Sequence, residues 1–302
     1  MFTGRTLSII ALIGVSLGYG LLSVAARWLD TSFGIFTQVY IRIFLAMVAT
    51  IIIFPRDIRW RNIKALNIKD WLVLLLMGIV GYGLMIFAIT KGALITTLLN
   101  VSVLFSTVPI FVYLLGVIFL KRRWRYIILG LLLVSIWGVG VLSSGQFIPA
   151  LSELGVGDWW VILSAFFEAV WYLGIKLMEK KLNSREITVI AQGIASVVIF
   201  ALALYAGESI PNLSNLFSWQ VSLGLFIGVV MNVLAPLLTI YAFKHLDEVF
   251  ATQLFLSENI FSLFVGYFFY GEMIGIISLF GAGVVIASVY TMNKIQASEP
   301  IS

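Results

Sequence analysis

FAITKGALITTLLNVSVLFSTVPIFVYLLGVIFLKRRWRYIILG, residues 87–130, has a partner later in the chain, YAFKHLDEVFATQLFLSENIFSLFVGYFFYGEMIGIISLFG, residues 241–281. Each stretch contains an apolar run, a very short turn, a second apolar run with a polar or helix-disturbing centre, a tight break and a glycine-opened third run. Internal similarity of this kind indicates a duplicated unit. The pairs that align are Val108-Pro109 with Glu258-Asn259, and Lys121-Arg122 with Gly271-Glu272.

The composition places most of this chain in lipid. Of the 302 residues, 61% are hydrophobic and 11% are charged, whereas a soluble domain carries roughly a quarter charged residues. So few charged side chains cannot cover a water-soluble protein of this size, and the apolar excess must face a bilayer. We expect an all-α integral membrane fold, because the apolar runs are unbroken and do not alternate with a period of two.

Ten apolar runs are long enough to cross a hydrocarbon core as helices that rise about 1.5 Å per residue. We expect the first run to remain as a span, since it exceeds the roughly 7–15 residues of a signal-peptide core. The expected transmembrane helices are residues 7–27, 33–54, 71–90, 94–119, 126–144, 159–178, 187–206, 219–243, 248–270 and 273–292.

Basic residues indicate the orientation. With the N-terminus in the cytoplasm, 16 of the 19 lysines and arginines fall on the cytoplasmic side. Segments 55–70, 121–125 and 176–185 carry most of them, so the positive-inside rule predicts a multi-pass protein of the cell membrane, inner or plasma, with both termini cytoplasmic. We interpret the net charge of +5 as this topological signal and expect no nucleic-acid partner.

Five spans in each half invert the second half relative to the first. We therefore expect a first five-helix repeat over residues 1–144, an extracytoplasmic linker over 145–158, a second repeat over 159–292 and a cytoplasmic tail over 293–302. Many secondary transporters build two interconvertible faces around a midplane site from such inverted repeats. The sequence thus predicts a secondary active transporter that works by alternating access.

A family resemblance follows from these features. The ten spans, the short connection between spans 3 and 4, Glu258 followed by Gly271-Glu272, and the closing GAGVVIAS at 281–288 resemble the EamA branch of the drug/metabolite transporter superfamily. The first half departs from the family pattern, because Lys121-Arg122 stands in place of Gly-Glu and Val108 in place of an acidic residue. The resemblance implies a central cavity lined by spans 1–4 and 6–9, peripheral spans 5 and 10, and export or exchange of small organic molecules such as amino acids.

Three charged residues are expected near the membrane centre, where each costs at least about 2.5–3.5 kcal/mol. They are Arg42 in span 2, Glu168 in span 6 and Glu258 in span 9. In one interpretation, Arg42 binds an anionic group of the solute while the glutamates bind a cation or a proton, so that a zwitterion or amine is the expected solute. In the other, Arg42 pairs permanently with a glutamate and holds the spans together. The sequence leaves both interpretations open.

Polar and aromatic side chains away from the membrane surfaces are further candidates for contact with the solute. Amides in lipid need hydrogen-bond partners, and aromatic faces stack on rings or attract cations, although helix packing alone also explains each one. The polar candidates are Asn100, Gln192, Asn232 and Asn259, and the aromatic ones are Tyr19, Tyr82, Trp171 and Tyr172. Pro109 and Pro236 are expected mid-span, where each frees a backbone carbonyl and bends its helix, as at a gate.

Other function classes are disfavoured. The chain has no GxxxxGK[ST] loop of an ATP-driven pump, no cysteine and one histidine, His245, so we expect no nucleotide, metal or other cofactor and no catalytic residues. An intramembrane enzyme gives no account of the repeat, and a channel needs a filter segment that is not evident. The main alternative is a carrier of nucleotide-like or phosphorylated solutes, which one arginine against two glutamates disfavours.

The sequence allows either a monomer or a homodimer in the bilayer. Small residues in spans 5 and 10 offer a surface on which two copies can pack closely. These residues are Gly130, Gly138, Gly140, Gly281 and Gly283.

Overall fold

The computed structural model describes residues 3–149, 154–208, 218–270 and 273–297, and over these ranges it contains helices and no strands. Parts of the predicted linker 145–158 and tail 293–302, and the pair Gly271-Glu272, lie outside the described residues. The elements are α1 (Gly4–Asp30), α2 (Ile35–Ile53), α3 (Trp60–Lys64), α4 (Ile68–Leu76), the π-helix η1 (Met77–Leu84), α5 (Met85–Ile95), α6 (Leu98–Phe105), α7 (Val108–Phe119), α8 (Tyr126–Ser144), α9 (Val156–Met178), α10 (Ser184–Tyr205), α11 (Trp219–Phe243), α12 (Glu248–Leu254), α13 (Ser257–Tyr270) and α14 (Ile276–Ala297).

Within the described ranges, eight helical segments are long and apolar enough to cross a membrane. The predicted all-helical membrane fold is confirmed at this level, while the count of ten spans stays a prediction. The two remaining predicted spans correspond to α1, of which Gly4–Tyr19 is a shorter apolar stretch, and to the α12–α13 pair. The eight segments are Ile35–Ile53, Ile68–Ile95, Leu99–Phe119, Tyr126–Ser144, Val156–Met178, Ser184–Tyr205, Trp219–Phe243 and Ile276–Ile295.

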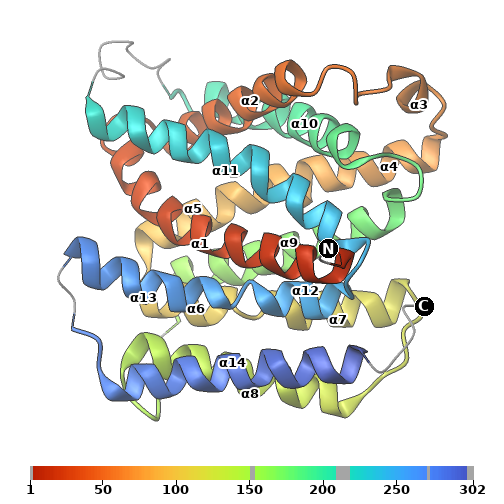
Figure 1. The fold of residues 1–302 in the computed structure, drawn as a ribbon. Helices are drawn as coiled ribbons and strands as arrows, with labels where there is room; N and C mark the ends of the chain where they lie inside the picture. Colours follow the sequence, from red (N-terminus) through yellow and green to blue (C-terminus); the bar gives the residue numbers. More distant parts are fainter. Residues whose placement is uncertain (1–2, 150–153, 209–217, 271–272, 298–302) are drawn as a thin grey trace.

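The fourth and ninth predicted spans are each interrupted in the middle. The first helix of each pair ends at Phe105 or at Leu254, and a second helix begins within three residues. The starts of the two pairs also correspond, because the side chains of Thr97 and Asp247, at aligned positions, each accept a hydrogen bond from a following backbone N–H. The pairs α6–α7 and α12–α13 run in opposite directions (Figure 1).

The two mid-span prolines differ in their effect. Pro109 stands in the first turn of α7, where a missing N–H costs nothing, so the prediction that it bends a continuous helix is wrong. The chain is already interrupted before it. Pro236 does lie inside α11, as predicted, and removes one hydrogen bond from that helix.

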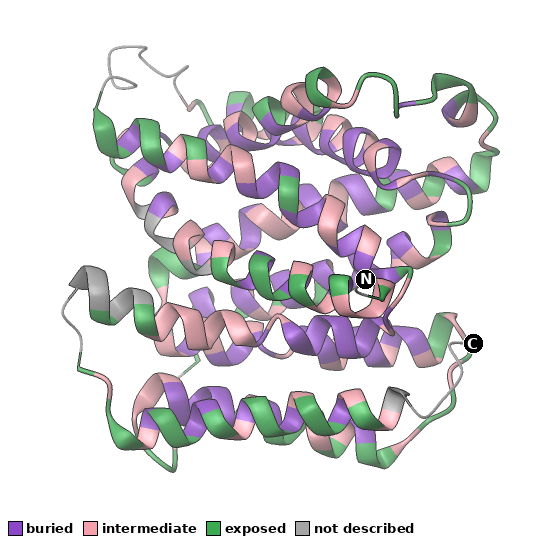
Figure 2. Ribbon diagram, in the orientation of Figure 1, coloured by how far each residue is buried: buried purple, intermediate pink, exposed green. Residues whose placement is uncertain are grey.

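The helices form stacked layers. In Figure 1, α2, α10 and α11 lie on one side, α8 and α14 form a layer on the other, and α1, α5, α9 and the interrupted pairs fill the space between them. The main pairings are α1 with α11, α5 with α9, α2 with α10 and α8 with α14. Buried residues concentrate on the facing sides of the helices, while α8 and α14 keep broad exposed faces (Figure 2). This arrangement matches the peripheral position expected for spans 5 and 10.

Glycines bring α8 and α14 into close contact. A Cβ placed on Gly281 would lie 2.4 Å from the backbone nitrogen of Leu142 and 2.7 Å from the carbonyl oxygen of Gly138. A side chain at Gly140 would meet Pro149. Three of the five glycines proposed for a dimer surface are thus used within the chain, whereas Gly130 and Gly283 face open space.

Carboxylates near the two ends of α10 bind the start of α2 and the start of α3. At one end, Glu208 accepts hydrogen bonds from the backbone N–H groups of Phe36 (3.1 Å) and Thr37 (2.7 Å), at the start of α2. At the other end, Glu186, at the start of α10, accepts from the backbone N–H of Arg59 at 3.0 Å. A negative charge at a helix N-terminus is favourable, so both contacts stabilise these helix starts.

The start of α1 and the end of α14 lie at the same end of the molecule, since Arg5 donates to the side-chain oxygen of Asn293. We call this the basic end, because the segments that join α2 to α4, α7 to α8 and α9 to α10 also lie there (Figure 1) and carry most of the lysines and arginines. The short helix α3, which the hydropathy pattern did not predict, belongs to it.

Filling the α8–α14 contact should destabilise the fold. We expect Gly281→Val to lower stability by about 1–3 kcal/mol, because the new side chain would press against backbone atoms that cannot move away. Gly283→Val, on the same helix and facing open space, is the matched control. The measurement is thermal unfolding of both variants in detergent, and equal melting temperatures would contradict this packing.

Candidate functional site

A network of neutral polar groups connects three helices inside the layer. The hydroxyl of Tyr82 on η1 donates to Oδ1 of Asn232 on α11 at 2.9 Å, and it accepts from Nε2 of Gln192 on α10 at 3.0 Å. The same Gln192 nitrogen donates to the carbonyl oxygen of Asn232 at 2.6 Å. All three residues were predicted from the sequence, and the structure brings them together as one group, which we call the amide network.

The glycines of η1 place Tyr82 in this network. A Cβ on Gly81 would lie 2.8 Å from backbone atoms of Trp171, and one on Gly78 would meet Ile194 at 2.7 Å, so η1 approaches both α9 and α10 at backbone distance. The Tyr82 and Trp171 rings consequently meet edge to face, with their centroids 5.2 Å apart. Short π-helical segments often occur at functional sites, and here the segment carries a site candidate.

Arg42 extends from α2 toward the amide network. Its Nε donates to the carbonyl oxygen of Gln38 at 3.1 Å, and its methylene chain crosses α11 at Gly228, where a Cβ would lie 2.5 Å from its Cδ. The side chain is 3% exposed, and Nη2 has no hydrogen-bond partner. The guanidinium interacts electrostatically with Tyr82, but within the described ranges it forms no ion pair with a carboxylate.

The two glutamates lie close enough to interact electrostatically. Glu168 accepts a hydrogen bond from the Tyr172 hydroxyl at 2.5 Å through Oε1, while its Oε2 has no partner. Glu258 stands in the first turn of α13, and among the described residues its carboxylate makes no hydrogen bond or ion pair. The two carboxylates interact electrostatically with each other and with Tyr19 of α1. We call Tyr19, Glu168, Tyr172 and Glu258 the carboxylate cluster.

Aromatic rings enclose the carboxylate cluster. The ring of Phe255, at the interruption between α12 and α13, lies 6.0 Å from the Tyr19 ring and 6.1 Å from the Tyr172 ring, measured between centroids. Sequence reasoning did not select Phe255, although its position beside Glu258 was a usable signal. Tyr19 also interacts electrostatically with Tyr82, so the cluster adjoins the amide network.

Asn259 joins the two helix interruptions. Its Nδ2 lies 3.4 Å from Oγ of Ser106, at the end of α6, and 3.3 Å from the carbonyl oxygen of Leu256. The aligned centres of the two repeats therefore meet directly across the interior. This contact places Asn259, the neighbour of Glu258, between the two interruptions.

Asn100 does not join this group. Its Nδ2 donates to Oδ1 of Asp158 at 2.8 Å, and Thr96 donates to the same oxygen at 2.6 Å. This buried contact lies at the end opposite the basic end, where α6 and α9 begin. The candidate solute contact at Asn100 therefore lies apart from Gln192 and Asn232, because Asn100 stands in the first turn of α6 and bonds to Asp158.

Within the described ranges, no three His, Cys, Asp or Glu side chains are grouped closely enough to hold a metal ion. The site comprises Arg42, the carboxylate cluster, the amide network, Asn259 and the ring of Phe255. These groups recognise charge and hydrogen-bonding pattern, and they line the meeting point of helices from both halves of the chain.

The fold and this polar interior define a polytopic helical membrane protein. The chain superposes on one solved crystal structure with a TM-score of 0.73, covering 97% of this chain and 98% of that one, at 12% sequence identity. At that identity the likeness concerns the fold alone. Two curated relatives, each 25% identical, are an uncharacterized transporter of Archaeoglobus fulgidus, aligned over 249 residues, and the uncharacterized transporter sll1164 of Synechocystis, aligned over 201 residues.

The first alignment covers 82% of this chain and 84% of the relative, and the second covers 62% of this chain but only 56% of the relative. The chain thus matches less than two thirds of the length of the Synechocystis protein. The model of the EamA-like transporter family matches twice, over residues 6–144 and 155–294. The chain therefore belongs to the EamA-like transporter family, and the predicted resemblance is confirmed. The names of the family and of both relatives are those of transporters and not of enzymes.

Removing one hydroxyl should weaken the amide network. We expect Tyr82→Phe to lower stability by about 1–2 kcal/mol, because Oδ1 of Asn232 loses its donor inside the protein. Tyr40→Phe is the matched control, since the Tyr40 ring packs against Phe44 and Phe200 and its hydroxyl makes no hydrogen bond among the described residues. Thermal unfolding measures the difference, and two equal melting temperatures would count against the network.

Proposed function

We propose that this protein is a secondary active transporter that exports or exchanges a small organic solute, a zwitterion such as an amino acid or a related amine, by alternating access. The observation that carries the proposal is that Arg42 and Glu168 are buried and, like Glu258, form no ion pair among the described residues. Charges in a membrane interior are costly unless they are paired or functional. A permanent ion pair between Arg42 and a glutamate would have favoured the alternative interpretation, in which these residues only hold the spans together.

The free hydrogen-bonding groups support a solute with both signs of charge. Nη2 of Arg42 is a donor without a partner, suited to a carboxylate, and Oε2 of Glu168 is an acceptor without a partner, suited to an ammonium group. Gln192 adds a second free acceptor through Oε1. A zwitterion satisfies the arginine and one carboxylate at the same time.

The aromatic rings favour an amine at the carboxylate cluster. Tyr19, Tyr172 and Phe255 surround the two glutamates, and ring faces attract organic cations when water is excluded. Either glutamate can instead carry a proton, and the carboxylate that the solute leaves unoccupied is our candidate for proton coupling. This division of labour requires two carboxylates, as the site provides.

The architecture that goes with this mechanism is a pair of inverted five-helix repeats, residues 1–144 and 159–292, that form ten spans in the cell membrane. Both termini are proposed to be cytoplasmic, so the basic end faces the cytoplasm. The opposed α6–α7 and α12–α13 pairs, which meet at Ser106 and Asn259, support this proposal, because transporters of this kind place discontinuous helices at the midplane.

The second candidate function is that of a carrier of nucleotide-like or phosphorylated solutes. A polyanionic solute requires several basic groups, and Arg42 is the single one that reaches the interior site among the described residues. The two carboxylates of the carboxylate cluster would repel such a solute. We therefore favour the zwitterion or amine.

A thermal-shift screen of the purified protein tests the solute class. We expect amino acids and amines to stabilise the protein above sugar phosphates and nucleotides, by about 2.7 kcal/mol at 100 times the dissociation constant. The screen measures melting temperature in detergent at a fixed salt concentration. The reverse order of stabilisation would replace this proposal with the phosphorylated-solute carrier.

Transport by charge-neutralised variants tests the roles of the three charged residues. In proteoliposomes with a solute found by the screen, we expect Glu168→Gln, Glu258→Gln and Arg42→Gln each to lower counterflow about tenfold or more, since a charge-assisted bond is worth about 1.5–3 kcal/mol. Arg42→Gln should affect zwitterions more than simple amines. Full flux with both glutamates neutralised would exclude their role.

The matched controls are Asp57→Asn and Arg56→Gln, which remove charges from exposed positions of the basic end and should leave the flux unchanged. Counterflow that saturates with solute concentration distinguishes a carrier from a channel. A flux that rises linearly at high gradients would favour the channel.

A further inference from the structure

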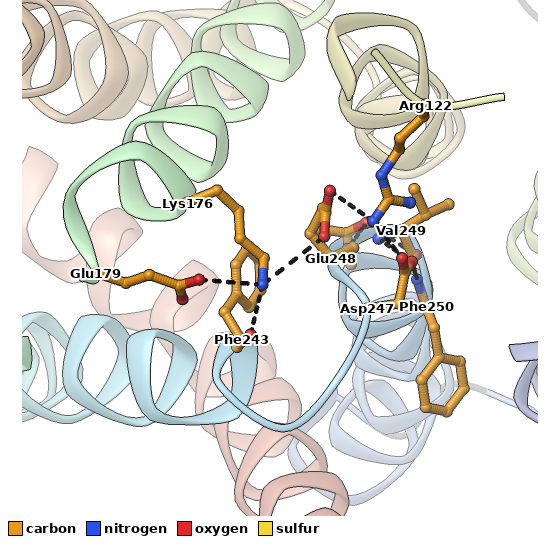
Figure 3. Close-up of polar contacts among 9 residues, drawn as sticks. Arg122, Lys176, Glu179, Phe243, Asp247, Glu248, Val249 and Phe250 are labelled. Atoms are coloured by element: carbon orange, nitrogen blue, oxygen red, sulfur yellow. Dashed lines mark hydrogen bonds and ion pairs between the residues drawn. The ribbon is translucent and has the colours of Figure 1, made fainter. Parts of the chain in front are cut away.

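An ion-pair cluster at the basic end links the two halves of the chain. Arg122, in the segment between α7 and α8, approaches the start of α12, where its Nη2 lies 2.8 Å from Oε1 of Glu248 and also pairs with Asp247 (Figure 3). The Glu248 side chain is 4% exposed and that of Arg122 is 23% exposed. The sequence had attributed residues 121–125 to membrane topology alone.

Lys176 of α9 completes the cluster. Its Nζ donates to the carbonyl oxygen of Phe243 at 2.6 Å, pairs with Glu179 at 3.4 Å and lies 4.0 Å from Oε2 of Glu248 (Figure 3). Glu248 is therefore held between a lysine of the second half and an arginine of the first. Burial lowers the pKa of the Arg122 guanidinium, but Asp247 and Glu248 more than offset this and the net pKa is raised.

The backbone before Arg122 directs its side chain toward α12. Lys121 has a φ of 56°, in the left-handed region that few side chains adopt, and its aligned residue in the second half is Gly271. The N–H of Arg122 then donates to the carbonyl oxygen of Gly116 at 3.3 Å. The Arg122 side chain lies along α7 at this same glycine, where a Cβ would be 3.0 Å from its Cδ.

These contacts close the space on one side of the candidate site. Both α7 and α12 connect the helix interruptions in the interior to the basic end, and they pack against each other. A bond between the end of α7 and the start of α12 therefore joins the two halves on the basic side of Glu258. Opening a path from the site to this side requires that the two helices separate.

We propose that Arg122 is a latch residue, whose ion pairs with Asp247 and Glu248 hold the pathway closed at the basic end and break when the pathway opens there. This inference rests on the proposed transport function. The aligned position in the second half carries Glu272. The latch therefore belongs to one end of the protein, and it sets the balance between the two states of alternating access.

Cysteine accessibility tests the latch, because the natural chain contains no cysteine. Ser106→Cys places one thiol at the interior contact, where the serine side chain is buried. In this background we expect Arg122→Gln to raise the rate of labelling by a membrane-impermeant thiol reagent about five- to tenfold, and only from the basic side. Membrane vesicles of both orientations distinguish the two sides.

Three further variants separate the latch from general loosening. Asp247→Asn removes the charge but keeps a side chain that can cap α12, so it should raise labelling from the basic side as Arg122→Gln does. Arg122→Lys keeps the positive charge, so the thiol at position 106 should be labelled nearly as slowly as in the protein that retains Arg122. Arg123→Gln, which removes an exposed arginine without an ion pair among the described residues, should change nothing.

The latch is overturned if Arg122→Gln and Asp247→Asn both label within twofold of Arg123→Gln, or if labelling rises equally from both sides. Labelling needs no solute, so its outcome is independent of the transport assay. If the unmodified protein shows no solute flux but Arg122→Gln raises labelling from the basic side alone, the result counts against the proposed solute and supports the latch. Saturable flux with unchanged labelling would leave the transporter standing and remove the latch.

Discussion

Inside a lipid layer, polar groups can be satisfied only by the protein or by what it binds, and this constraint organises the whole interior. The amide network meets it completely for the Tyr82 hydroxyl, because Asn232 and Gln192 supply its acceptor and donor from two other helices. Arg42 and Glu168 do not meet it, since each retains a buried atom without a partner. Among the described residues the Tyr82 hydroxyl is thus fully satisfied, whereas Arg42, Glu168 and Gln192 each keep one polar atom for the solute that we propose.

Close helix approach is what makes this arrangement possible. Tyr82 reaches its partners because Gly81 lets η1 touch the backbone of α9, and Arg42 reaches the interior because Gly228 leaves a groove in α11. A methyl group at either glycine would meet atoms closer than 3 Å. In the peripheral α8–α14 layer, Gly281 allows an equally close approach that serves packing alone. The presence of closely packed glycines therefore does not by itself identify the site.

The two halves contribute different chemistry to one interior. Both carboxylates of the site, Glu168 and Glu258, lie in the second half, and Arg42 lies in the first. At the basic end the same division recurs, with Arg122 from the first half against Asp247 and Glu248 from the second. In the alternating-access mechanism that we propose, a solute or an ion pair that joins opposite charges of the two halves favours the state in which it forms.

The sequence by itself determined the helical membrane fold, the family and the identity of the three interior charges, because hydropathy and charge act locally along the chain. It also selected Tyr82, Gln192 and Asn232, which the structure joins. It named Asn100 as a candidate solute contact, whereas the structure bonds Asn100 to Asp158, and it assigned a bend to Pro109, which instead stands at the start of α7. Only the tertiary structure decided that Arg42 forms no ion pair with the glutamates and that Arg122 contacts the second half. Both facts depend on the relative placement of helices far apart in sequence, about which hydrophobic periodicity carries no information.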